Sequence, residues 1–360
     1  MSKPTFRVID TGLREGRANI AFDQALIDAH KEGEVPDTIR FLRFPPTALI
    51  GRHQALSQEV ELTHCYDNDI GVVRRITGGG AIYFDQGQLG WELAFSRKTL
   101  GISSLAELTK AICEAAALGI GHLGVDAKYR PRNDIEVDGR KICGTGGFFD
   151  GDTLFYQGTL LIDMDPSHMV AALKVPAAKL KKRGLDSAEQ RVTTLKALLG
   201  DDLPSLPTIQ NSLLAGFAVG LGIEPVWGEI TAGEESRANA AFENEIGTDE
   251  FVHEIDDPGT GDNVLVSSHA CPGGAVSCYL RLEGPGAPRI REVLFTGDFF
   301  VTPPRTVFDL EASLRGVPAN DAGDAVEKFF AEASVDLLTI MPADFRTVLE
   351  NAIAAARADG

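Results

Sequence analysis

The stretch RRITGGGAIYFDQG, residues 74–87, places two arginines directly before three consecutive glycines and an apolar run. Three ordered glycines are costly, because glycine loses more conformational freedom on folding than any other residue. A tight turn between strands explains them; so does a loop whose backbone N–H groups approach an anion while the arginines supply charge and paired donors. Apolar runs at 70–73 and 81–84 predict a hairpin-type connection between buried strands. Neither the strand, loop and helix of a dinucleotide fingerprint nor GxxxxGK[ST] is present.

Around this loop, short apolar runs and amphipathic segments predict an α+β fold. We expect helices over residues 19–33, 103–124 (capped by Ser103 or Ser104), 187–200 and 209–222. We expect strands over residues 38–44, 47–51, 91–96 and 152–165. Residues 133–144 predict a hairpin that turns at Asp138-Gly139. Because 360 residues exceed one typical core, we expect two domains, residues 1–248 and a small α+β accessory domain of residues 249–360.

The composition excludes several classes of protein. A net charge of −18, concentrated in the C-terminal part, argues against a nucleic-acid binder. There is no run of eighteen apolar residues and no charged-then-apolar leader, so we expect a cytoplasmic protein without a membrane segment. The five cysteines are scattered and form no CxxC pair, which argues against a disulfide framework or a zinc knuckle.

Several motifs follow one another along the chain. They are LIGRHQ (49–54), RRITGGGAIYFD (74–85), RNDIEVDGRKICGTGG (132–147), FYQGTLLIDMD (155–165) and QRVTTL (190–195), the last preceded by Lys179, Lys181 and Lys182. In this order they resemble the lipoate-protein ligase family, within the wider group of biotin- and lipoate-protein ligases and octanoyltransferases. The family patterns are RRxSGGGAVYHD, RNDLxxxGRKxSGSA, HHGTLLxxxD and SRVTNL. The resemblance spans about residues 8–225 and implies a mixed β-sheet catalytic domain with flanking helices.

The resemblance also implies an acyl-adenylate site. Forming an amide from a carboxylic acid needs a better leaving group than hydroxide, and adenylation supplies one. Lys141 would be the catalytic residue, placed to touch the acyl carbonyl and the α-phosphate where charge develops. Asp134 would also bind Mg²⁺, which takes one or two carboxylates plus phosphate oxygens. The adenylate-binding residues would be Arg52, Arg74, Arg75, Thr77, Gly78, Gly79, Gly80, Tyr83, Asn133, Asp134, Thr145 and Gly146. From the residues alone, Lys141 could be a surface lysine after a turn, and Asn133-Asp134 an Asx turn.

The implied activity is an ATP-dependent lipoate-protein ligase using ATP, Mg²⁺ and lipoate. It would form lipoyl-AMP and pass the lipoyl group to a lysine of a lipoyl-carrier domain. The acceptor could be an oxoacid dehydrogenase subunit, the glycine-cleavage carrier or a dedicated lipoate-binding protein of sulfur oxidation. The larger ligases of the family carry a small accessory domain, which residues 249–360 would match. We expect a monomer.

Three departures from the family pattern keep alternatives open. Phe84 and Gln157 stand where the family has histidines, and the run DQGQLGWELAF (85–95) differs from the ligase-like DxGNxNxSF, its GQL being similar to the octanoyltransferase branch. A ligand-binding relative that has lost turnover is therefore one alternative. The other is an octanoyltransferase that forms a cysteine thioester without ATP. Its cysteine would lie in Val125–Arg132 or Asp165–Lys174, but neither segment contains one. Cys143 occupies the serine position of the family's KxSG, where we interpret it as a packing residue.

Overall fold

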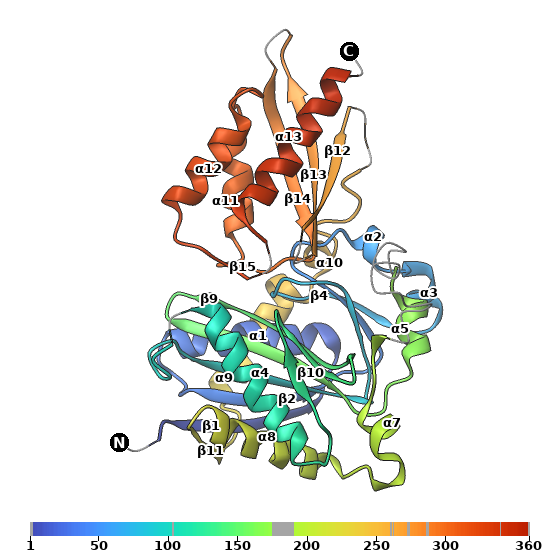
Figure 1. The fold of residues 1–360 in the computed structure, drawn as a ribbon, viewed down its shortest axis with the longest axis vertical. Coiled ribbons are helices and arrows are strands. Elements are labelled where there is room, and N and C mark those ends of the chain that lie inside the picture. The colour runs from blue at the N-terminus through green and yellow to red at the C-terminus, as the bar shows by residue number, and fades with distance from the viewer. Residues whose placement is uncertain are drawn as a thin grey trace.

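The computed structural model describes residues 3–102, 104–174, 191–259, 261, 263–271, 274–285, 288–338 and 340–358. An eight-stranded sheet forms the centre of the N-terminal part (Figure 1). Its strands, in spatial order, are β11 (Glu224–Trp227), β1 (Thr5–Leu13), β2 (Thr38–Arg43), β6 (Gln88–Ser96), β10 (Thr153–Leu161), β9 (Arg140–Asp150), β8 (Asp134–Val137) and β7 (Lys128–Arg130). The pairs β11–β1 and β1–β2 are parallel, and the other pairs are antiparallel. The predicted α+β fold with a mixed sheet is confirmed.

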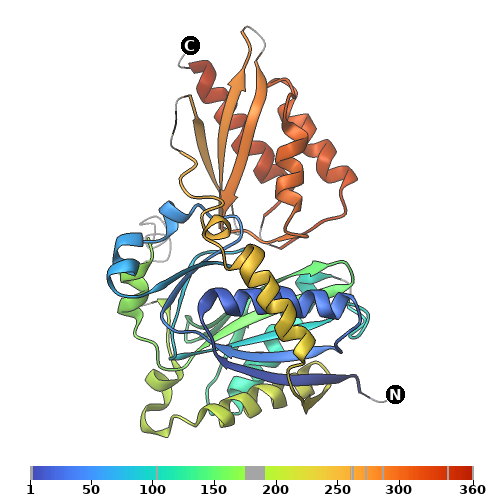
Figure 2. The ribbon, with the colours of Figure 1, turned by 180° about the vertical axis from the view of Figure 1, so that it is seen from behind.

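Helices cover both faces of this sheet. On one face, α4 (Leu105–Gly121) and α8 (Leu206–Gly220) pack on side chains that include Trp91 and Tyr156. On the other face lie α1 (Gly16–Lys31) and α9 (Ala232–Ala241), which cross each other in Figure 2. Ser104 caps α4 by accepting a hydrogen bond from the Glu107 N–H, whereas Ser103 lies outside the described residues.

The glycine loop does not connect a hairpin, so that prediction was wrong. A second, three-stranded sheet has the order β4 (Gly71–Arg74), β3 (Thr47–Ile50) and β5 (Ile82–Phe84). Because β3 pairs parallel with β4 and antiparallel with β5, it lies between the two strands that the loop joins. The loop therefore crosses the end of β3, where the Arg52 N–H donates to the Thr77 carbonyl at 2.9 Å.

Other predictions had mixed outcomes. The β8–β9 hairpin turns at Asp138 and Gly139, with φ of 50° and 76°, as expected for its Asp-Gly turn. The helix expected over 187–200 is wrong in its described part. Val192 is extended and forms a parallel bridge with Lys141, and only α7 (Leu195–Leu199) is helical. Lys179, Lys181 and Lys182 lie outside the described residues. Short helices α2 (Leu56–Glu59), α3 (Leu62–Asp67) and α5 (Pro166–Ala172) flank the small sheet.

The C-terminal part has its own hydrophobic core. Three antiparallel strands, β12 (Leu265–Cys271), β13 (Gly274–Glu283) and β14 (Arg289–Gly297), are packed by α11 (Thr306–Leu314), α12 (Ala322–Glu332) and α13 (Pro342–Ala358). A short pair, β15 (Val301–Thr302) and β16 (Asp336–Leu337), faces the N-terminal part (Figure 1). Sequence reasoning missed β12 and α13. Between the two parts, α9 continues into a π-helical turn (Phe242–Ile246) and α10 (Asp249–Val252), whose Phe251 and Val252 pack into N-terminal cores.

Within the described ranges, no helix combines the length and the apolar character needed to cross a membrane.

Candidate active site

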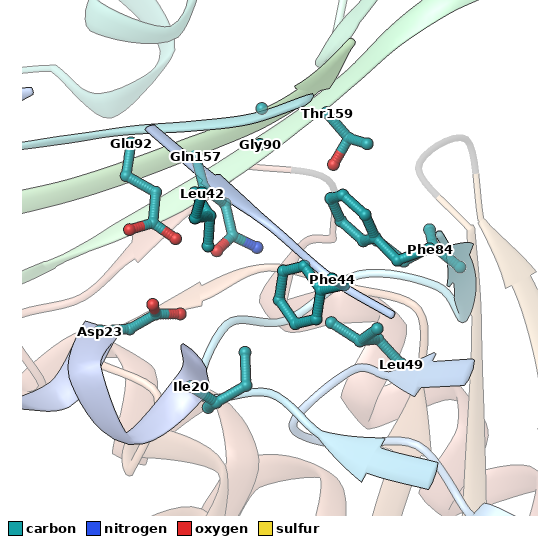
Figure 3. A pocket seen from close by; sticks show the side chains of 12 residues that line it. Ile20, Asp23, Leu42, Phe44, Leu49, Phe84, Gly90, Glu92, Gln157 and Thr159 are labelled. Carbon is teal, nitrogen blue, oxygen red and sulfur yellow. The ribbon is translucent and has the colours of Figure 1, made fainter. Parts of the chain in front are cut away.

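A pocket lies on the face of the large sheet that α1 covers, and we call it the central pocket (Figure 3). It is narrow: the centres of water-sized spheres can occupy about 20 Å³ of it, and the 290 Å³ of space around them that atoms leave free includes open solvent. Apolar walls with a few polar groups are typical of small-molecule sites. Its lining residues are Ile20, Asp23, Leu42, Phe44, Leu49, Ile82, Phe84, Gly90, Glu92, Gln157, Gly158 and Thr159. Two of the departures from the family pattern, Phe84 and Gln157, therefore line it.

Strand register explains the floor of the central pocket. Directly paired residues of antiparallel strands place their side chains on the same face. Two rows of paired residues run across β2, β6, β10 and β9. The first row is Arg40, Glu92, Gln157 and Gly146, and the adjacent row is Leu42, Gly90, Thr159 and Gly144. The glycines in these rows let neighbouring side chains approach the sheet closely, since a Cβ atom would meet Leu42 on Gly90, Lys141 on Gly144 and Phe300 on Gly146.

A β-bulge turns Lys141 toward the same face. Asp134 pairs with Gly144 and Glu136 pairs with Lys141, so β9 has one extra residue, Ile142. A bulge changes the face to which the following side chains point. The Lys141 Nζ lies 2.9 Å from Asp134 Oδ1, and a Cβ atom on Gly144 would come within 2.4 Å of that Nζ. The structure thus brings the predicted pair Lys141 and Asp134 together, and a glycine makes room for the ammonium.

The glycine loop is held by Arg75 and joined to the central pocket by Gln157. The buried Arg75 guanidinium donates to Thr77 Oγ1 at 3.0 Å and to the carbonyls of Gly78 and Gly80 at 2.7 and 2.9 Å. Burial lowers the pKa of Arg75 to about 10. Gln157 Nε2 donates to the same Thr77 hydroxyl at 2.9 Å. Arg75 and Thr77 therefore set the shape of the loop beside the pocket.

A C-terminal segment covers the glycine loop. The Gly79 N–H donates to the Phe299 carbonyl at 3.0 Å. The Phe300 ring lies against two glycines, since a Cβ atom would meet it at 2.5 Å on Gly79 and at 2.3 Å on Gly146. Gly79 also has a φ of 91°, a conformation that favours glycine. Phe300 thus occupies the space between the loop and β9, and the Gly79 donor is in use.

Two predicted phosphate-binding arginines do not face this space. The Arg74 side chain is fully buried at the junction of the two parts, where its donors meet only backbone carbonyls, those of Gly51, Arg52, Gln54, Phe251, Val252 and Ile255. The Arg52 side chain pairs with Glu254 and lies over the rings of Phe251 and Phe308. Both arginines therefore tie the end of β3 to C-terminal residues, a role that sequence reasoning had not assigned to them.

Three other predicted residues hold the site from behind. Tyr83 lies between two residues that line the central pocket, so strand alternation turns its ring to the opposite face, where it packs near Ile50. Thr145 Oγ1 bonds Tyr156 at 2.6 Å and the Asn133 carbonyl at 2.9 Å on the α4 side of the sheet. Asn133 donates its side-chain amide to the Thr145 carbonyl. Neither Tyr83 nor the Thr145 hydroxyl faces the pocket.

The cysteines of the chain lie away from the central pocket. All five cysteines of the chain are buried, and none lines the central pocket. Cys143 faces the α4 side, where it belongs to the same core as Trp91. Burial raises the pKa of the Cys143 thiol far above its ordinary value, with only partial compensation from the nearby Lys141 charge. The thiolate needed for acyl transfer is disfavoured there.

The family model for the lipoyl protein ligase A/B catalytic domain matches residues 15–218. The chain belongs to this family. Octanoyltransferase LipM from Kyrpidia tusciae is 30% identical over 258 residues, which cover 65% of this chain and 93% of that protein. An octanoyltransferase is therefore among the proteins similar to this chain.

Solved structures extend the family likeness. A bi-partite lipoate protein ligase of Thermoplasma acidophilum, described together with its E2 lipoyl domain, has a TM-score of 0.61 and 26% identity over 70% of this chain and 97% of its own. A lipoate-protein ligase A bound with ATP has a TM-score of 0.60 and 25% identity, covering 71% of this chain and all of that one. LipL1 of P. falciparum, at 14% identity and a TM-score of 0.72, covers 98% of this chain and 99% of its own, and so shows the fold of both parts.

A resident metal centre is absent from the described part of this ligase/transferase-family chain, where no three His, Cys, Asp or Glu side chains are grouped to hold an ion. The single carboxylate of Asp134 fits a different situation. Mg²⁺ that is bound together with a nucleotide typically takes one or two carboxylates, and phosphate oxygens and water are its other ligands. The Asp134 carboxylate has the chemistry of such a ligand.

Sequence reasoning missed three charged residues beside the pocket, Asp23, Arg40 and Glu92. Each interrupts an apolar run: Asp23 in NIAFDQALI, Arg40 in TIRFLRF and Glu92 in WELAFS. Charged residues are almost never fully buried unless paired. Opposite charges in several core segments were the signal that could have identified this cluster.

Proposed function

We propose that the chain is an ATP-dependent lipoate-protein ligase. The observation that carries this proposal is the position of Lys141, whose ammonium lies on the pocket face of β9 beside Asp134. No cysteine lines the pocket, which favours activation by adenylation over a thioester intermediate. The similar ligase A bound with ATP supports the choice of nucleotide.

In the proposed reaction, a lipoate carboxylate oxygen attacks the α-phosphorus of Mg·ATP and pyrophosphate leaves. The central pocket would hold the acyl chain and exclude water from it. The Lys141 ammonium would stabilise the negative charge that develops on the α-phosphate, and Asp134 would keep that ammonium in position. An acceptor lysine amine would then attack the acyl carbonyl and release AMP. Lys141 would again stabilise the oxyanion.

Adenylate binding would involve the C-terminal part. Because the Gly79 N–H donates to the Phe299 carbonyl, a phosphate oxygen would replace that carbonyl to use this donor. Phe300 would leave the surface of Gly146 in the same movement. We propose that residues 249–360 form an accessory domain whose position changes with the state of the site, and that residues 1–248 form the catalytic domain.

The proposed acceptor is the lysine of a lipoyl-carrier domain. The Thermoplasma acidophilum ligase, described with its E2 lipoyl domain, supports this class of partner. Oxoacid dehydrogenase subunits, the glycine-cleavage carrier and a dedicated lipoate-binding protein are the candidates to compare.

The test is to incubate the protein with each carrier, lipoate and Mg·ATP, and to weigh the carrier by mass spectrometry. We expect a gain of one lipoyl group that requires ATP, and release of pyrophosphate that requires lipoate. Transfer from an octanoyl-carrier thioester without ATP would instead support the octanoyltransferase that the LipM relative represents. Binding of a lipoyl-adenylate analogue without either transfer would show a non-catalytic relative.

A further inference from the structure

A fully buried charge cluster forms one end of the central pocket. It consists of Asp23 on α1, Arg40 on β2 and Glu92 on β6. One Arg40 nitrogen, Nη1, donates to Asp23 Oδ1 at 2.5 Å and to Glu92 Oε2 at 2.9 Å. Figure 3 shows the two carboxyl groups pointing toward each other beside Gln157. Two carboxyls therefore depend on a single guanidinium.

The cluster has fewer donors than acceptors. The other Arg40 donors are in use, because Nη2 donates to Asn19 Oδ1 at 2.7 Å and Nε to Thr11 Oγ1 at 3.0 Å. Asp23 is 1% exposed, and no protein donor among the described residues reaches its Oδ2. A buried acceptor without a donor is costly. Because Asp23 and Glu92 both line the pocket, a ligand can supply what the protein lacks.

The electrostatics agree with this shortage of donors. Burial, and then the neighbouring Glu92 charge, raise the pKa of Asp23 well above its ordinary value, although Arg40 opposes the shift. Burial likewise raises the pKa of Glu92. A side-chain hydrogen bond between the two carboxyls contributes to both shifts. The pair thus favours one shared proton over two carboxylates, and a donor on a ligand would take the place of that proton.

The position of the cluster identifies the part of a ligand that meets it. Lys141 lies on β9, and β10 separates β9 from β6, which carries Glu92. Neighbouring strands lie about 4.8 Å apart, so β6 and β9 are ~10 Å apart across the sheet. The Lys141 ammonium lies over Gly144, two residues along β9 from the Gly146 that shares a row with Glu92, so the separation of the two sites is ~12 Å. An extended eight-carbon acyl chain has a comparable length. If its carboxylate lies near Lys141, its far end reaches Asp23 and Glu92.

We propose that the central pocket selects an acyl chain whose far end donates hydrogen bonds, namely the reduced dithiol form of lipoate. This inference rests on the proposed function. Two S–H groups can donate to Asp23 and Glu92, and hydrogen bonds to a carboxylate are stronger than those between neutral groups. The cyclic disulfide offers only weak acceptors, and an octanoyl methyl group would leave the carboxyls with their shared proton alone. Walls such as Phe44 and Phe84 suit the methylene chain.

The test measures binding of dihydrolipoate, lipoate and octanoate to the full chain by calorimetry, without ATP or carrier. The dithiol and octanoate are compared under argon with a phosphine reductant, and the disulfide without reductant. We expect dihydrolipoate to bind about tenfold more tightly than octanoate, the effect of one charge-assisted hydrogen bond, with lipoate between them. Equal affinities for dihydrolipoate and octanoate would overturn the inference, and this result does not depend on any variant.

Variants assign the preference to the cluster. Asp23→Asn replaces a carboxyl oxygen, which accepts hydrogen bonds, by an amide NH₂ group, which donates them. Glu92→Gln makes the same change in the second carboxyl of the cluster. Each variant should lose most of the preference for dihydrolipoate over octanoate, measured as the ratio of the two affinities. The matched control is Asp37→Asn, a half-buried carboxyl bonded to His30 and Thr99 away from the pocket, which should keep the preference. Retention of the preference in folded Asp23→Asn and Glu92→Gln would contradict the assignment.

Pyrophosphate release with each acid separates this inference from the proposed function. Adenylation without a preference for dihydrolipoate would refute only the inference. Preferential binding without adenylation by any acid would refute only the ligase activity.

Discussion

Two ion-pair sites on the same face of the large sheet differ in exposure, one at its β9 end and one where β2 and β6 meet α1. At the β9 end, the side chains of Lys141 and Asp134 are 33% and 19% exposed. At the other end, Arg40 is 0% exposed, and its partners Asp23 and Glu92 are 1% and 3% exposed. Exposed pairs contribute little to stability, whereas breaking a buried pair leaves an uncompensated charge. The first pair can therefore exchange partners at little cost in stability, whereas the second contributes to holding α1, β2 and β6 together.

The largest expected effect is on activity at the exposed end. Lys141→Ala should lower the rate of adenylation about 100- to 1,000-fold, because it removes the cation placed where charge develops. The melting temperature should stay near that of the wild type, since the pair is partly exposed. Pyrophosphate release and thermal unfolding measure the two quantities.

Lys128→Ala is the matched control for that variant. Lys128 belongs to the same sheet and pairs with Asp126, with both side chains largely exposed. It should change neither rate nor stability. A Lys141→Ala protein that adenylates lipoate at the wild-type rate would show that the exposed pair is only structural.

A substitution in the buried cluster should lower the free energy of unfolding. Arg40→Met leaves two buried carboxyls without their cation, and we expect a loss of about 3–5 kcal/mol in the free energy of unfolding. Chemical denaturation measures it. The control Lys98→Met removes an exposed partner of Asp152 and should cost no more than about 1 kcal/mol. An equal loss in both variants would remove the distinction between the ends.

A third carboxyl sharpens the role of Arg40, because the partly buried Glu311 on α11 has no arginine partner among the described residues. Burial raises its pKa to about 8, despite the hydrogen bond it accepts from the Phe295 N–H at 2.6 Å. The folded protein keeps this proton while the unfolded chain releases it near pH 4.5. The stability that Glu311 contributes is thus full below pH 4.5 and is lost as the pH rises to about 8.

Glu311→Gln should remove this part of the pH dependence. We expect the melting temperature of the wild type to fall a few degrees more between pH 5 and 8 than that of the variant. Thermal unfolding at several pH values measures the difference. The control is Glu332→Gln at an exposed position, which should leave the pH profile of the melting temperature unchanged. Parallel profiles for the wild type and Glu311→Gln would contradict the expectation.

The smallest effect is expected behind the exposed end. Cys143→Ala should change lipoyl transfer by less than about twofold, because its thiol is buried on the opposite face from Lys141. The carrier mass assay measures transfer, and Cys113→Ala, in the same core, is the matched control. Loss of transfer in Cys143→Ala alone would favour a thioester mechanism.

Local patterns predicted most of the fold but only part of the site. The α1 helix, the β8–β9 hairpin and the Lys141–Asp134 neighbourhood followed from periodicity, turn residues and motif order. The glycine loop did not, because its flanking strands look alike whether they pair with each other or with β3 between them. Arg74 was assigned to phosphate since sequence cannot show that its donors meet carbonyls from residues 251–255. The charge cluster depends on three segments that meet only in the folded sheet.

The extra residue in β9 has a consequence for how this protein could be altered. Ile142 is the single insertion that puts Lys141 on the pocket face while Cys143 stays on the other. Deleting one residue there would restore regular alternation and point the lysine into the α4 core. A change in strand length of one codon would thus remove the ammonium from the face that carries Asp134 and Gly144 without replacing any of these residues. Strand length at this position is as much a determinant of chemistry as the lysine itself.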